Sequence, residues 1–457
     1  MDRGRLDAAA LERQIAADEI DTVVVAFTDL QGRLVGKRVT GRFFSDSVLA
    51  GGVEACNYLL AVDVDMAPLP GYRFASWEQG YGDLECRPDL ATLRRIPWLD
   101  KTALVLCDVF GASGQPVEVS PRQILRRQVE RAAALGFTVM CGSELEFYLF
   151  RDSYEEARAK GYADLTYHAP YVQDYHVLQT TRDEYVIRVI RNGMEAAGVP
   201  VEFSKGEAGP GQHEINLQYA DALEMADRHV IYKNGAKEIA GLAGRAITFM
   251  AKYAIDQSGS SCHIHSSLWD RTGGQPQFWG ESEVDHWSPV FRNWLGGLVL
   301  HTGELTWLFA PTVNSYKRYQ PASWAPTALV WGLDNRTCGF RVVGDGPTSL
   351  RVESRVPGAD CNPYLAFAAT IAAGLHGLAH EEDPGARFDG NAYEAGDVAR
   401  VPSTVVDAIA ALEQSTLAAD AFGAEVHQHL VNTAQQEWAS FGAVVTDWER
   451  RRCFEQL

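Results

Sequence analysis

Paired cysteines and long apolar runs are both missing from this 457-residue sequence. Its eight cysteines are scattered and form no CxxC pair. This distribution argues against a zinc site of that type and against a disulfide framework, and it is typical of reduced, buried thiols. Nowhere do about 18 uncharged apolar residues follow one another, and the N-terminus lacks the apolar segment of a signal peptide. We therefore expect a cytoplasmic protein.

Positive charge is in short supply. The chain has 41 lysines and arginines against 60 acidic residues, which gives a net charge of −19. Nucleic acids and anionic membranes both select basic surfaces, so neither is expected as a partner. An anionic small substrate is compatible with this balance wherever bases are concentrated locally. Internal repeats, low-complexity tracts and a phosphate-binding P-loop are lacking as well.

The composition is ordinary for a globular protein, with 46% hydrophobic and 22% charged residues. A chain of this length exceeds one core, so we expect two domains, residues 1–112 and 113–457. The first is predicted to contain a helix over 7–18, a hairpin over 22–40 around a Gln-Gly turn, and a strand over 102–110.

The segment 111–121 (GASGQPVEVSP) is predicted to be a linker. Ser120 followed by Pro121 is typical of a helix N-terminus and opens a helix that runs to Gly136. Beyond it, strands and long helices mix without strict β-α-β alternation. This favours an α+β fold with an antiparallel sheet over a doubly wound one. Further helices are expected near 222–252, 288–309, 363–380 and 404–418.

Two glutamates interrupt the otherwise apolar segment SELEFYLF (143–150). In a strand, side chains at i and i+2 point to the same face, so Glu144 and Glu146 would share one face while the apolar residues face a core. Taken alone, this pattern is more typical of an amphipathic strand with a solvated face.

Three further segments repeat the pattern. GQHEINLQY (211–219) places Glu214 on a polar face, and Glu207 lies seven residues earlier. Each segment alone is unremarkable, because a single HxH or ExR is more often structural than a ligand pair. The other polar faces carry His263 and His265 in 261–269, and Arg351, Glu353 and Arg355 in 350–356.

Together, these strands point to bound cations. A sheet face this rich in acids would repel itself unless positive charge neutralised it. Five glutamates and one histidine are what two hard divalent cations need, with water and substrate oxygens completing the shells. Oxygen-dominated ligation favours Mg²⁺ or Mn²⁺ over zinc.

Positive charge is concentrated between residues 317 and 355, where six bases accompany three acids. Guanidinium groups are suited to clamping carboxylates and phosphates. Two metals beside an arginine cluster are typical of phosphoryl transfer, in which catalysis is mostly positioning and neutralisation of developing charge. The bases are Lys317, Arg318, Arg336, Arg341, Arg351 and Arg355.

Six motifs, in this order and spacing, resemble the glutamine synthetase superfamily of bacterial type. They are SELEFYLF, EAGPGQHE, DQSGSSCHIHSSL, NSYKRYQPASWAP, NRTCGFRV and RVESRVPGADCNPYLAFAA. The resemblance covers nearly the whole chain and is most specific from 140 to 370. It implies a small N-terminal β-grasp domain, a larger catalytic domain with a funnel-shaped active site, and a ring-built dodecamer with sites between neighbouring subunits.

The resemblance also implies ATP-dependent ligation, in which the γ-carboxylate of glutamate is phosphorylated and an amine then attacks the γ-glutamyl phosphate. One metal would be held by Glu146, Glu207 and Glu214, and the second by Glu144, His263 and Glu353. ATP would meet Tyr219, His265, Ser267, Arg336, Arg341 and Arg351. Glutamate and its phosphorylated carboxylate would lie among Gly259, Arg318 and Arg355, with Arg318, Arg336 and Arg341 as the catalytic arginines.

The sequence departs from the ammonia-using members at the amine site. Trp324 stands where those members have an acid that binds and deprotonates ammonium, so we assign it to amine specificity. The stretch 51–63 lacks their Asp-Gly-Ser-Ser loop, and Ser258 replaces an asparagine beside the glutamate site. Tyr393 stands near the place of a regulatory tyrosine, but its surroundings lack the usual pattern.

We therefore expect a ligase that joins glutamate to a small organic amine, with ethanolamine slightly favoured over polyamines such as putrescine. The alternative is a glutamine synthetase that uses ammonia. Two other classes are weaker: an inactive superfamily member with a structural or sensing role, and a cupin-type iron site. A cupin places its acid closer to HxH than Asp270 lies, and it would leave the arginine cluster unexplained.

Overall fold

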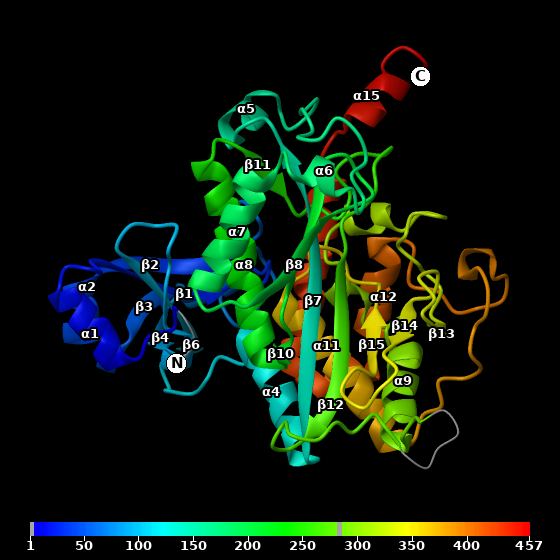
Figure 1. The fold of residues 1–457 in the computed structure, drawn as a ribbon, viewed down its shortest axis with the longest axis horizontal. Helices are drawn as coiled ribbons and strands as arrows, with labels where there is room; N and C mark the ends of the chain where they lie inside the picture. The colour runs from blue at the N-terminus through cyan, green and yellow to red at the C-terminus, as the bar shows by residue number, and fades with distance from the viewer. Residues whose placement is uncertain (1–3, 281–285) are drawn as a thin grey trace.

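The structure is a computed structural model in which residues 4–280 and 286–457 are described. Its N-terminal part is built on a six-stranded sheet with the order β2-β1-β6-β4-β3, and β5 pairs with β6. In Figure 1 this sheet forms the lobe on the left. The strands are β1 (Thr22–Thr28), β2 (Leu34–Thr40), β3 (Val53–Cys56), β4 (Asp83–Pro88), β5 (Arg94–Arg95) and β6 (Thr102–Phe110).

The predicted hairpin and strand of the N-terminal part are confirmed. β1 pairs antiparallel with β2 and parallel with β6, the strand at 102–110. Asp29 closes the hairpin turn, because its Oδ1 accepts hydrogen bonds from the backbone N–H groups of Gln31 (3.1 Å) and Arg33 (2.8 Å). The predicted helix at 7–18 is α1 (Ala8–Ala16), which begins after the capping side chain of Asp7.

A nine-stranded sheet forms the larger part, with the order β13-β14-β15-β12-β7-β9-β8 and with β10 and β11 paired to β7. Its pairs are antiparallel except β13 with β14, which confirms the expected α+β fold. Figure 1 shows β7 and β12 side by side through its middle. The strands are β7 (Phe137–Phe150), β8 (Val201–Gly206), β9 (Gln212–Leu217), β10 (Ala220–Asp221), β11 (Ala246–Thr248), β12 (Cys262–Asp270), β13 (Trp331–Leu333), β14 (Phe340–Val343) and β15 (Arg351–Ser354).

Helices cover the apolar face of this sheet. α4 (Pro121–Ala134) and α8 (Ala222–Leu242) pack against β7, and α11 (Pro363–His380) packs against α4, α8 and α9 (Pro289–His301). The others are α2 (Gly41–Phe43), α3 (Leu49–Gly51), α5 (Tyr154–Ala159), α6 (Val177–Thr180), α7 (Glu184–Ala196), α10 (Thr306–Phe309), α12 (Val405–Gln414), α13 (Thr416–Phe422), α14 (Ala424–Gly442) and α15 (Asp447–Cys453). In the described part of the chain, no helix combines the length and apolar character needed to cross a membrane.

Three predicted helices are shorter than expected, while the helix at 363–380 is confirmed as α11. The helix predicted at 222–252 ends at Leu242, because Gly244 takes a left-handed conformation (φ +64°) and the chain then enters β11. The helix predicted at 288–309 is interrupted between α9 and α10. The one at 404–418 breaks at Ser415, whose extended backbone and side chain cap α13.

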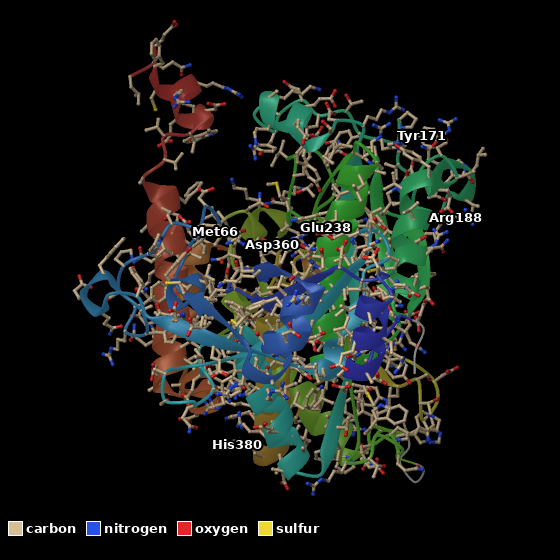
Figure 2. The ribbon with its side chains drawn as sticks, turned by 90° about the vertical axis from the view of Figure 1, so that its left-hand side faces the viewer. Met66, Tyr171, Arg188, Glu238, Asp360 and His380 are labelled. Atoms are coloured by element: carbon tan, nitrogen blue, oxygen red, sulfur yellow. The ribbon has the colours of Figure 1, made fainter. Side chains whose placement is uncertain are left out.

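The two parts share one apolar core. The segment 111–121 is packed rather than free, since Val117 and Val119 are buried and the Val117 N–H donates to the Val109 carbonyl at 2.9 Å. Arg122 at the start of α4 pairs with Asp89 and Asp108 of the N-terminal part. Figure 2 faces this N-terminal side of the molecule. A domain boundary after residue 112 stays a prediction.

Candidate active site

The alternation predicted for SELEFYLF is present in β7. Leu145 and Phe147 are fully buried in the core, and the two glutamates point to the opposite face. Pairing brings the other polar strands alongside: Glu146 lies opposite Glu214 of β9, and Glu144 lies opposite His263 of β12. The sheet register therefore gathers side chains that are far apart in the sequence.

Three carboxylates meet on the polar face of the sheet, on the side of β7 that pairs with β9. Oxygens of Glu146, Glu207 and Glu214 all lie within 4.8 Å of one another. Burial raises the pKa of Glu146 to about 8, with Glu207 adding repulsion, and burial followed by neighbouring carboxylates raises the pKa of Glu214 well above its usual value. Lys205 pairs with Glu207. This excess of buried negative charge fits a divalent cation with oxygen ligands.

A second group lies on the same face of the sheet, on the side of β7 that pairs with β12. His263 Nδ1 is 3.2 Å from a Glu144 oxygen and 3.4 Å from a Glu353 oxygen, and His265 Nε2 is 2.8 Å from Glu144. Burial opposes ionisation of Glu144, yet His265 and His263 hold its pKa well below the usual range. Burial and Arg355 lower the pKa of His263, so its imidazole is neutral and able to bind a metal.

The second group also contains an unpaired nitrogen. His263 Nε2 is buried and has no hydrogen-bond partner among residues 4–280 and 286–457. The other ring nitrogen, Nδ1, is the one that faces Glu144 and Glu353. The structure therefore brings together all six residues predicted to hold metal, in the two predicted groups. It also adds His265 to the second group, a residue that the sequence assigned to ATP.

Arginines surround Glu353, which is completely buried. Arg341 donates to Glu353 at 2.7 Å and also contacts Asp334, while Arg355 donates to the other Glu353 oxygen at 2.5 Å. Burial opposes ionisation, but Arg355 above all lowers the pKa of Glu353 to about 2. Arg336 is more exposed and lies 3.9 Å from Asp334.

Arg318 is buried behind the glutamate site predicted from the sequence. Its guanidinium donates to the Val356 and Arg355 carbonyls and to Ser261 Oγ. A Cβ atom on Gly259 would come within 2.6 Å of the Arg318 side chain, so only glycine allows this close approach. Arg318 thus fixes the chain around Gly259.

Two adjoining cavities are separated by Glu144 and Asn216, which line both. The smaller, of about 290 Å³, is lined by four of the residues assigned to ATP: Tyr219, His265, Ser267 and Arg351. The larger, of about 400 Å³, is lined by the carboxylates of the first group and by Gly259, His263, Trp324, Arg336, Arg341 and Arg355. Arg318 and Glu353 are not among the lining residues that the structure describes.

Trp324 lies at the larger cavity and is 57% exposed, so it does not fill a core. Its backbone is left-handed (φ +62°), which is uncommon for a bulky residue and occurs more often at functional sites. Its carbonyl accepts a hydrogen bond from Arg355 at 3.4 Å. The indole is therefore held beside the arginine that the sequence assigned to glutamate.

Some lining residues were missed from the sequence. Lys205 lies in β8, two residues before Glu207, which directly follows the strand, so its spacing from Glu207 was a usable signal. Asp174, Tyr175 and Phe203 also line the larger cavity, but no motif in their segments indicated it. Tyr175 lies over the Lys205 ammonium, 4.3 Å from ring centre to nitrogen.

A family comparison matches residues 118–453 to the glutamine synthetase catalytic domain. The chain belongs to the glutamine synthetase family. This membership agrees with the fold and with the two groups of acidic side chains on one sheet.

Three relatives within the glutamine synthetase family match almost the full chain. One is gamma-glutamylethanolamide synthetase GlnA4 of Streptomyces coelicolor, 52% identical over 99% of this chain and 96% of the relative. The other is a glutamate–isopropylamine ligase of Pseudomonas sp., 36% identical over 96% of both chains. A glutamine synthetase of Thermotoga maritima is 30% identical over 97% of this chain and 98% of its own.

Solved structures have the same fold. A structure described as apo GmaS without ligand is 30% identical, with a TM-score of 0.84 over 98% of this chain and 99% of its own. A GmaS/ADP complex is 31% identical with the same TM-score, over 97% of this chain and 99% of its own.

Proposed function

We propose that this protein is an ATP-dependent ligase that joins the γ-carboxylate of L-glutamate, through γ-glutamyl phosphate, to a small organic amine. The observation that carries the proposal is the pair of adjoining cavities with Glu144 between them. One is lined by four of the residues assigned to ATP, and the other combines carboxylates, arginines and an exposed indole. Phosphoryl transfer between two substrates needs such a shared boundary.

Two divalent cations, Mg²⁺ or Mn²⁺, fit the two acidic groups. The first would bind Glu146, Glu207 and Glu214, and the second Glu144, His263 and Glu353, with His265 close by. Bound there, the cations would neutralise phosphoryl oxygens. The support is the raised pKa values of Glu146 and Glu214 for the first cation, and the approach of His263 Nδ1 to oxygens of Glu144 and Glu353 for the second.

The nucleotide would occupy the smaller cavity. Tyr219 is half exposed there and offers a ring face to the base, and Ser267 offers a hydroxyl. The Arg351 side chain is held in place by a hydrogen bond that its own Nε donates to His265 Nδ1, at 3.1 Å. Arg336 and Arg341 line the other cavity, and we propose that they meet the transferring phosphoryl group from the glutamate side.

Glutamate and the amine would occupy the larger cavity. Gly259 and Arg355 line it, while Arg318 supports the wall behind. Trp324 replaces the carboxylate of the ammonia-using members. At this position the cavity therefore offers a π face and apolar area instead of a fixed charge. A protonated amine with methylene groups gains from both, whereas ammonium gains only from the π face.

Ethanolamine is the amine we favour. The 52% identical relative is named for gamma-glutamylethanolamide synthesis. A long polyamine carries extra positive charges, which would need acidic side chains beside them. We also propose a catalytic domain from residue 113, preceded by a β-grasp domain over 1–112. The proposed assembly is a ring-built dodecamer with its sites between subunits.

The second candidate is a glutamine synthetase that uses ammonia, the activity named for the Thermotoga relative. Trp324 disfavours it, because deprotonating ammonium calls for a carboxylate at this place. An inactive member is disfavoured as well, since all six proposed metal ligands are retained and assembled.

The test is ADP release measured with ATP, Mg²⁺ and glutamate against ammonium, ethanolamine, isopropylamine and putrescine. Ethanolamine is expected to give the highest kcat/KM, with γ-glutamylethanolamide identified as product by mass spectrometry. Ammonium as the best substrate would select the second candidate. No ADP with any amine, from protein that binds ATP, would overturn the proposed ligase.

A further inference from the structure

A third group of metal-binding side chains lies outside the two cavities. Nitrogens of His301 and His376 and an oxygen of Glu382 lie within 4.8 Å of one another. His301 Nε2 is 2.9 Å and His376 Nδ1 is 3.0 Å from the same Glu382 oxygen. Figure 2 labels His380, the last residue of α11, at the lower end of the molecule, and its ring stacks on His376 at 3.9 Å.

The two histidines meet because helices α9 and α11 approach unusually closely. Gly297 of α9 lies so near α11 that a Cβ atom would come within 2.1 Å of the Ala373 carbonyl. One turn later α9 ends at His301, and the imidazoles of His301 and His376 are 4.3 Å apart between ring centres. The C-terminal ends of both helices carry the negative end of the helix dipole, which favours a cation.

Backbone strain places the carboxylate. Glu381, which follows α11, has a left-handed backbone (φ +51°) although it is not glycine, a conformation that residues with a side chain rarely adopt. The turn brings Glu382 back toward α11, where its N–H donates to the Gly377 carbonyl at 3.0 Å. Its second oxygen, Oε2, is buried with no hydrogen-bond partner within residues 4–280 and 286–457.

A further carboxylate orients one imidazole. His301 Nδ1 donates to Glu304 at 2.6 Å. This contact fixes the tautomer that leaves Nε2 as the ligand atom, as in histidines that bind metals. Two neutral imidazoles and two carboxylates give a charge that suits a 2+ ion.

We propose that His301, His376 and Glu382 bind a zinc-type transition-metal ion that joins the ends of α9 and α11, separately from the catalytic cations. Two nitrogens and one carboxylate oxygen match the zinc sites that keep one position for water. The buried, unpaired Glu382 oxygen and the strained turn before it are both accounted for by such an ion.

The experiment uses the full chain carrying His263→Asn and His265→Asn, which removes both imidazoles of the second group. Metal-free protein in excess Mg²⁺ is titrated with Zn²⁺ against a chromophoric chelator. One equivalent per chain is expected to bind tightly, and Co²⁺ should give a visible absorption band. Zinc should also raise the thermal midpoint, because a ligand that binds only the folded state stabilises it.

Three variants and one control decide the assignment. Adding His376→Gln or Glu382→Gln should abolish the tight equivalent, the cobalt band and the thermal shift, while circular dichroism stays unchanged. Glu304→Gln leaves all three ligands in place and should weaken zinc binding about 10–100-fold. The control is His427→Gln, a partly buried histidine of α14, which should change none of these. Unchanged zinc affinity in His376→Gln and Glu382→Gln, or no tight equivalent at all, would overturn the proposal.

Discussion

At the scale of single residues, the proposed amine site depends on the side chain that stands in place of a carboxylate. Trp324 exposes more than half of its side chain at a cavity whose lining includes several carboxylates and arginines. Each buried methylene contributes roughly 0.8 kcal/mol, so the two carbons of ethanolamine gain about 1.6 kcal/mol over ammonium. Contact with the indole therefore separates the two amines by about a factor of ten.

We predict that Trp324→Ala lowers kcat/KM for ethanolamine about tenfold and leaves the KM for ATP unchanged. Trp324→Glu should shift the preference toward ammonium by restoring a carboxylate. The measurement is ADP release with each amine. Trp438→Ala, which removes an exposed tryptophan of α14, is the control and should have no effect. A wild-type ethanolamine preference that survives in Trp324→Ala would assign the amine to another part of the cavity.

A second residue-scale prediction concerns Glu146. We expect Glu146→Gln to lower kcat a hundredfold or more, because loss of a ligand charge weakens electrostatic stabilisation worth several kcal/mol. Chelation should abolish wild-type activity, and Glu155→Gln on the exposed helix α5 should match wild type. Turnover in chelator-treated wild-type protein would exclude the metal assignment.

At the scale of helices and strands, the sequence predicted the features that depend on neighbouring residues in the chain better than those that depend on tertiary packing. Alternation within one strand is local, so the polar faces of β7, β9, β12 and β15 were predictable. The ends of the helices at Leu242 and Ser415 depend on how the following chain packs, and α7 and α14 were not predicted. The meeting of His301 with His376 depends on helix approach, which no local pattern encodes.

The link between α14 and the N-terminal part should respond to pH. His429 is buried, and its Nε2 donates to the Leu60 carbonyl at 2.9 Å. Burial lowers its pKa to about 4. The unfolded chain therefore binds more protons between about pH 6.5 and 4, and stability falls as the pH is lowered through that window. At pH 5 the loss from this residue is about 2 kcal/mol.

We predict that His429→Gln reduces the fall in thermal midpoint between pH 7 and pH 5, because glutamine keeps a donor for Leu60 but does not titrate. Midpoints of metal-free protein at both values give the measurement. Equal falls in both proteins would show that His429 is not the titrating group.

At the scale of the whole molecule, the two parts cannot be treated as independent. The core is continuous across them. The Asn362 side chain at the start of α11 donates to the Asp29 and Leu30 carbonyls at 3.1 and 3.2 Å, and Arg122 is buried against acids from both parts. Removing residues 1–112 would leave the Arg122 charge with fewer partners, which is costly.

The last prediction concerns assembly. The proposed dodecamer would place a neighbour's N-terminal part at the larger cavity. We expect light scattering to give a particle of about twelve chain masses. We also expect dissociation by mild denaturant to abolish ADP release before circular dichroism changes, because each site then loses the neighbour's contribution. Chains 113–457 alone should be inactive. A monomeric full chain with undiminished activity would contradict the shared site, whereas active isolated residues 113–457 would show that the N-terminal part is dispensable for catalysis.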